Sequence, residues 1–76
     1  MNDDMMDKHI RSRVKEDLED LGIQKNPRTN TKSFIYGTLL LSLDEVCHIV
    51  MDYRRAWGLE EYPALEVKRA LRRLLL

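Results

Sequence analysis

The chain has 76 residues, of which 43% are hydrophobic and 34% are charged. This length predicts one small domain with a thin core, because domains usually contain about 100 residues or more and smaller ones bury proportionally less surface. The composition is too apolar for a disordered polar tail, and 13 basic side chains cancel 13 acidic ones, which argues against the positive field of a non-specific nucleic-acid binder.

The residue types favour helix over strand and predict an all-α fold, since Leu, Arg, Lys, Glu, Asp and Ala outnumber the β-forming types. The single Cys47 cannot form an intramolecular disulfide, which fits a reducing compartment. Residues 1–8 contain three Asp and no apolar run. We therefore expect no signal peptide, no membrane span and a cytoplasmic location.

Residues 4–21 are predicted to form the first helix. Their apolar side chains recur every three or four positions, which places them on one stripe of a helix. This stripe consists of Met6, Ile10, Val14, Leu18 and Leu21. Gly22 then ends the helix.

Residues 23–33 are rich in Asn, Pro, Thr and Ser and predict an exposed loop. The following stretch, 33–41, has two interpretations. Phe34, Ile35, Tyr36 and Thr38 favour a strand. The spacing of Ile35, Leu39 and Leu43 instead suits a helix. We predict a short helix here, because a lone strand would have no visible partner in the rest of the chain.

Residues 43–57 are predicted to form the central helix. Ser42 and Glu45 match a capping box, in which each side chain binds the other residue's backbone amide. Apolar residues cover more than one face of this helix. They are Leu43, Val46, Cys47, Ile49, Val50, Met51, Tyr53, Ala56 and Trp57. Gly58 ends the helix by adopting a left-handed conformation that other residues reach only at a cost.

The last predicted helix covers residues 63–75 and begins with Pro63, which a first helical turn tolerates. Its apolar face consists of Ala64, Val67, Leu71, Leu74 and Leu75. Its opposite side gathers Lys68, Arg69, Arg72 and Arg73. The sequence therefore predicts three main helices, packed as a compact bundle in one domain spanning residues 1–76.

No constellation of side chains in the sequence points to catalysis. Cys47 and His48 are adjacent, and neighbouring helical residues point about 100° apart, so the two do not face each other as a nucleophile and its base must. Cysteine and histidine lack metal-ligand spacing, and the three glycines are too scattered to form a phosphate loop. We predict a non-enzymatic protein with no cofactor, no metal and no small-molecule substrate.

Two surfaces are candidates for binding. The central and last helices contain more large apolar groups than a thin core covers. These interface candidates are Ile49, Val50, Tyr53, Trp57, Leu71, Leu74 and Leu75. The alternative is that the other helices cover this surface within the bundle. Trp57 stands out, because large aromatic side chains often anchor interfaces.

The second candidate surface is cationic and would contact a phosphate backbone. It consists of Arg54, Arg55, Lys68, Arg69, Arg72 and Arg73. The alternative is a solvated face whose cations complement the helix dipole. The tight turn of a helix-turn-helix is missing, because Met51 stands where a turn glycine is expected and the helical pattern continues to Trp57.

These features together predict a small regulatory or adaptor protein that binds another protein, or a second copy of itself as a homodimer, through its helices. The alternative is a DNA-binding regulator that uses the basic C-terminal helix. Neutral net charge favours the first interpretation.

Overall fold

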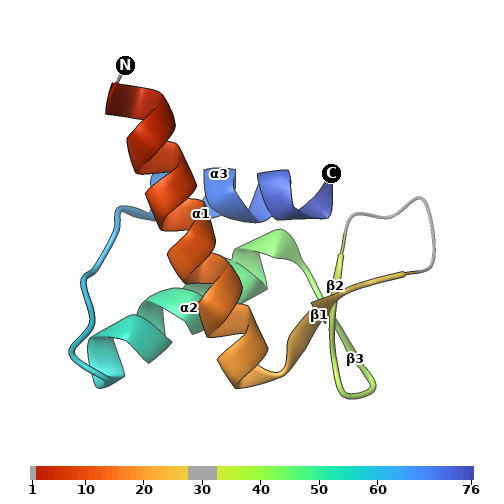
Figure 1. Cartoon of the computed structure of the whole chain (residues 1–76). Helices are drawn as coiled ribbons and strands as arrows, with labels where there is room; N and C mark the ends of the chain where they lie inside the picture. Colours follow the sequence, from red (N-terminus) through yellow and green to blue (C-terminus); the bar gives the residue numbers. More distant parts are fainter. Residues whose placement is uncertain (1, 28–32) are drawn as a thin grey trace.

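The computed structural model describes residues 2–27 and 33–76, which form three helices and a three-stranded antiparallel sheet (Figure 1). The all-α prediction is therefore wrong, because the fold is mixed α/β and not a helical bundle. The order along the chain is helix, three strands, then two helices.

The three main helices lie close to their predicted positions. Helix α1 spans Asn2–Leu21, α2 spans Leu43–Ala56 and α3 spans Ala64–Leu75. The predicted capping box at the start of α2 is confirmed, with both reciprocal hydrogen bonds present. Gly58 follows the end of α2 with a φ of 66°, the left-handed conformation expected of it.

The sheet occupies the part of the chain predicted as a loop and a short helix. Strand β1 spans Ile23–Lys25, β2 spans Phe34–Tyr36 and β3 spans Leu39–Leu41, with β2 in the middle. The predicted helix at 33–41 is thus wrong, and so is the loop where β1 lies; residues 28–32 of that loop lie outside the described part of the chain. Strand β2 pairs with β1 on one side and with β3 on the other. The spacing of apolar residues, which suggested a helix, does not reveal this pairing.

A two-residue turn joins β2 to β3. Tyr36 pairs with Leu39 across the turn, and Gly37 occupies its first position with a φ of 63°. Two-residue hairpin turns require a positive φ at this position because only then does the turn match the twist of the strands. Glycine adopts such a φ without steric strain.

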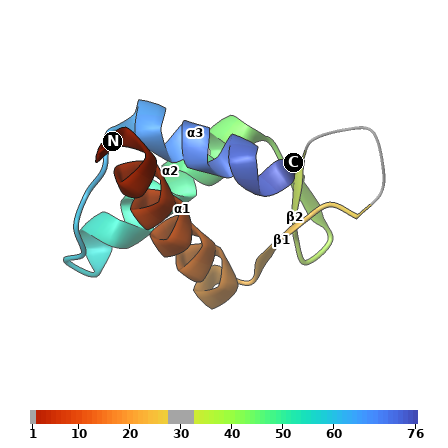
Figure 2. The same cartoon turned by 45° about the horizontal axis from the view of Figure 1, so that its top comes forward.

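One hydrophobic cluster joins the helices to the sheet. Helix α3 packs against both α1 and α2, and the C-terminal end of α3 approaches the sheet (Figure 2). The buried members are Ile10, Val14, Leu18, Ile23, Phe34, Val46, Cys47, Val50, Tyr62, Val67, Ala70, Leu71 and Leu75. Within the described residues, no helix combines the length and apolar character that crossing a membrane demands.

Candidate interaction surfaces

Arg54, a predicted nucleic-acid residue, lies in the interior and not on the surface. Its Nη1 atom donates a hydrogen bond to Oδ2 of Asp17 on α1 over 2.7 Å, and only 5% of Arg54 is exposed. Its Nε atom donates to the carbonyl oxygen of Glu60 over 2.6 Å. The guanidinium carbon also lies 4.9 Å from the centre of the Tyr62 ring. Arg54 therefore ties together α1, α2 and the segment that follows α2.

The carboxylate of Asp17 depends on this arginine. Desolvation by burial raises the pKa of Asp17 above its ordinary value of 3.8, while the hydrogen bond and the positive charge of Arg54 act in the opposite direction. A buried charge without its partner is costly, because neither water nor a counter-ion stabilises it. The pair thus has a structural role in joining α1 to α2.

Most of the other cationic candidates are paired with acids of the same chain. On α3, Lys68 Nζ lies 3.2 Å from Asp44, Arg69 lies 3.7 Å from Glu66, and Arg73 Nε lies 3.3 Å from Asp7. On α2, the exposed Arg55 forms ion pairs with Glu61 and Asp52. Arg72 is exposed on α3. These acids neutralise much of the positive potential that phosphate binding would need.

The predicted apolar interface divides between core and surface. Val50, Leu71 and Leu75 are buried in the core of this chain, and Ile49 and Leu74 are partly buried against it. Tyr53 and Trp57 remain accessible at the end of α2, with ring centres 6.5 Å apart. The Tyr53 hydroxyl donates to Asp20 on α1 over 3.0 Å, and Trp57 is 69% exposed.

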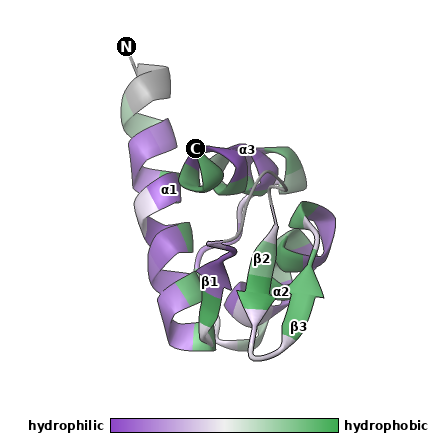
Figure 3. Ribbon diagram, turned by 90° about the vertical axis from the view of Figure 1, so that its right-hand side faces the viewer, coloured by the Kyte–Doolittle hydropathy of each residue, from purple (hydrophilic) through white to green (hydrophobic). Residues whose placement is uncertain are grey.

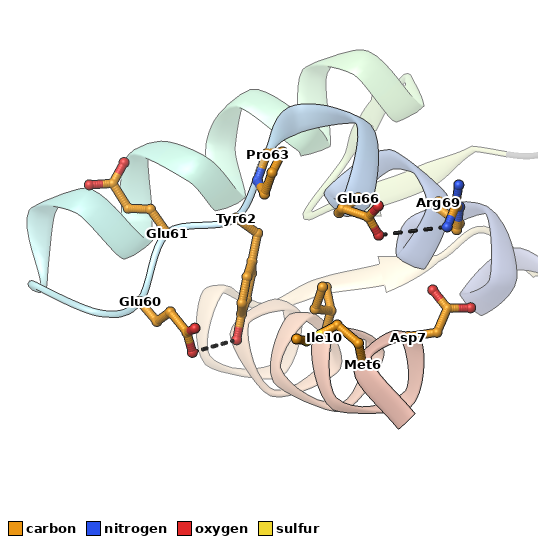
Figure 4. Close-up of a pocket in the computed structure, with 9 residues that line it drawn as sticks. All are labelled: Met6, Asp7, Ile10, Glu60, Glu61, Tyr62, Pro63, Glu66 and Arg69. Carbon is orange, nitrogen blue, oxygen red and sulfur yellow. Dashed lines mark hydrogen bonds and ion pairs between the residues drawn. The ribbon is translucent and has the colours of Figure 1, made fainter. Parts of the chain in front are cut away.

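A cleft of about 360 Å³ lies between α1, the segment before α3 and α3 itself (Figure 4). Its rim is acidic, but each carboxylate already has a partner. Glu60 accepts a hydrogen bond from the Tyr62 hydroxyl, and Glu66 pairs with Arg69. The other two acids, Asp7 and Glu61, pair with Arg73 and Arg55. Among the described residues, no group of three or more side chains is arranged to hold a metal ion.

The adjacent Cys47 and His48 separate as their helical spacing predicts, since Cys47 is buried and His48 is exposed. The Cys47 thiol lies 3.7 Å from the Met51 sulfur and 3.8 Å from the carbonyl oxygen of Ala64. Burial raises the pKa of this thiol above its ordinary value of 9.0. Cys47 is therefore protonated at neutral pH and shielded from reagents.

We expect folded protein to react with iodoacetamide at least about tenfold more slowly than unfolded protein, because the thiolate is the reacting species and burial disfavours it. The alkylation rate at pH 8, followed by mass spectrometry with and without guanidinium chloride, measures this difference. The unfolded chain serves as the control for intrinsic thiol reactivity. Equal rates in the two states would mean that Cys47 is accessible.

The hairpin of β2 and β3 forms an exposed surface that is not among those predicted from the sequence. Three of its apolar side chains are exposed to solvent: Tyr36 to 49%, Leu39 to 58% and Leu40 to 67%. Figure 3 shows a largely hydrophobic ribbon on β2 and β3, in contrast to the mostly hydrophilic α1. Residues 33–43 contain no charged residue at all, although a third of the whole chain is charged. Large apolar side chains exposed together on one hairpin are typical of a binding surface.

The backbone of β3 adds a second feature to this surface. β3 lies at the edge of the sheet, and in the described part of the chain only β2 pairs with it. Proteins usually protect such edges with lysine, proline or a covering segment, because free N–H and C=O groups attract further strands. β3 consists of three leucines and carries no such protection in its side chains.

A signal for this hairpin was present in the sequence. Two apolar triplets, at 34–36 and 39–41, are separated by Gly37 and Thr38 alone. Two strand-like runs that flank a two-residue turn containing glycine predict a hairpin. The helical spacing of Ile35 and Leu39 competed with that pattern, and the strands are too short for periodicity to decide.

Comparison with known proteins does not assign the chain to a family. No family model matches the chain, and neither a curated protein nor a solved structure is significantly similar to it.

Proposed function

We propose that this chain is a small non-enzymatic protein-binding module with a regulatory or adaptor role, and that the hairpin of β2 and β3 is its binding surface. The observation that carries the proposal is the exposure of Tyr36, Leu39 and Leu40 on an uncharged hairpin with a free strand edge. This surface replaces the helical interface predicted from the sequence, most of which packs into the core.

The physical basis is the burial of apolar surface together with backbone pairing. Removing apolar area from water yields about 25 cal/mol per Å², and the exposed Leu39 and Leu40 supply such area on the hairpin. The edge of β3 can extend the sheet by one strand, a common way of binding an extended segment. The two effects act at the same place.

The ion pairs on α3 favour protein binding over nucleic-acid binding. Lys68, Arg69 and Arg73 would each have to give up a partner of their own chain to contact phosphate. The hairpin has no ion pair to break on binding, because residues 34–41 are uncharged. Binding a protein at the hairpin therefore requires fewer ion pairs to be broken than binding phosphate at α3.

The proposal is tested by placing a photo-activated crosslinking residue at position 40 in the cells that make the protein. We expect discrete covalent adducts after illumination, because a partner covers Leu40. The matched control carries the same residue at position 12, where Ser12 is exposed on α1. A second control combines the position-40 crosslinker with Leu39→Glu, which places a charge in the interface.

Adducts that form from position 40, are absent from position 12 and disappear with Leu39→Glu support the proposal. Adducts from neither position, or the same adducts from both positions, contradict it. The adduct mass also separates a second copy of the chain from a different protein.

A further inference from the structure

We infer that the partner of the hairpin is a second copy of this chain, joined through antiparallel pairing of the two β3 strands around a two-fold axis. This inference rests on the proposed function and specifies its partner. It follows from the backbone geometry of β3, from the charge of the hairpin and from the charge of the whole chain.

The backbone of β3 presents one residue outward. Tyr36 pairs with Leu39 next to the turn and Phe34 pairs with Leu41, and hydrogen-bonded positions alternate along an antiparallel strand. A two-residue turn is closed by a hydrogen-bonded pair, so the backbone groups of Leu39 and Leu41 face β2. The N–H and C=O of Leu40 then face away from the sheet.

A single outward residue at the centre of the strand is self-complementary. When two β3 strands meet antiparallel with Leu40 opposite Leu40, each copy donates its amide to the other copy's carbonyl. This arrangement is the isologous contact of a symmetric dimer, in which the same patch serves both copies. The pairing continues the sheet from one copy into the other and removes both free edges.

The charges of the chain allow this contact. Residues 33–43 carry no charge, so two hairpins meet without burying an unpaired ion. The formal net charge of the chain is zero, so the two copies do not repel each other at long range. The other edge strand, β1, differs because it carries Lys25, whose Nζ atom donates to the carbonyl oxygen of Leu76.

Sedimentation equilibrium of the purified chain from micromolar to near-millimolar concentration tests the inference. We expect the apparent mass to rise from one copy to two. Leu40→Pro removes the outward N–H while keeping an apolar side chain, and Leu40→Lys adds a charge at the edge. Each variant should raise the dimer dissociation constant by about tenfold or more. The matched control is Trp57→Ala, which removes an exposed apolar group far from β3 and should leave the constant within about twofold.

Circular dichroism confirms that each variant is folded, and if Leu40→Pro does not fold, Leu40→Lys decides the outcome. Amide exchange gives an independent measurement, since the Leu40 amide should exchange more slowly as the protein concentration rises. A wild-type chain that stays monomeric throughout overturns this inference, while adducts from position 40 to a different protein would still support protein binding. A dimer weakened by Trp57→Ala and unaffected by Leu40→Lys also overturns it, because the interface then lies on α2.

Discussion

Arg54→Ala is expected to lower the free energy of unfolding by about 3–5 kcal/mol, because removing one member of a buried ion pair leaves the other charge without compensation. The charge left behind is Asp17, which is as deeply buried as Arg54. The substitution also removes the hydrogen bond to the carbonyl oxygen of Glu60 and the contact with the Tyr62 ring. Urea unfolding followed by circular dichroism measures the change.

The neighbouring Arg55 supplies the matched control. Arg55 is exposed, and its ion pairs with Asp52 and Glu61 lie at the surface, so Arg55→Ala should change stability by about 0.5 kcal/mol or less. If Arg54→Ala does not fold, the double variant Asp17→Leu with Arg54→Met provides a second measurement, because apolar replacement of both partners leaves no buried charge. Similar losses for Arg54→Ala and Arg55→Ala would contradict the structural role of the pair.

The loss caused by Arg54→Ala should also depend on pH. Without Arg54, burial and the negative charges of Asp20 and Glu16 raise the pKa of Asp17 in the folded state above its value in the unfolded chain. A carboxyl group with a raised folded pKa stabilises the fold below its unfolded pKa and loses that contribution as pH rises through the folded pKa. The difference between variant and wild type should therefore be smaller near pH 4 than at pH 7.

Phe34→Ala is expected to lower the free energy of unfolding by about 3–5 kcal/mol, because it empties a large buried site that the surrounding side chains cannot refill. Phe34 is 1% exposed and is among the largest fully buried side chains of the chain. It projects from the middle strand of the sheet into the cluster formed by the helices. Urea unfolding again measures the change.

Tyr36→Ala is the matched control for Phe34→Ala. Tyr36 lies on the same strand and is also aromatic, but about half of it is exposed, so its loss should be clearly smaller. Equal losses for the two variants would mean that β2 does not anchor the sheet in the core. A large loss for Phe34 alone would establish the sheet as an integral part of this fold.

The helices could be predicted from the sequence because their signals are local. The stripe from Ile10 to Leu18 repeats at helical spacing, and the bonds of the capping box at Ser42 and Glu45 form within a single turn. Pro63 precedes the first helical residue of α3, close to its predicted place. Such local signals do not depend on residues elsewhere in the chain.

The sheet and the interior position of Arg54 could not be predicted in the same way because both depend on distant partners. β1 became a strand by pairing with β2, across residues that separate them in the chain. Arg54 is buried because Asp17, 37 positions away, meets it between two helices. An arginine next to another arginine looks the same in the sequence whether it faces water or a buried carboxylate.

The junction of β3 and α2 has a mechanical consequence. Ser42 alone separates Leu41, the last residue of the strand, from Leu43, the first residue of the helix, and its hydrogen bonds with Glu45 cap that helix. The connection between β3 and α2 is therefore a single residue long, which couples the direction of the strand to the start of the helix. β3 is already paired with β2 and joined to the capped start of α2 by a single residue, so a partner that pairs with its exposed edge need not spend binding energy on ordering a loop.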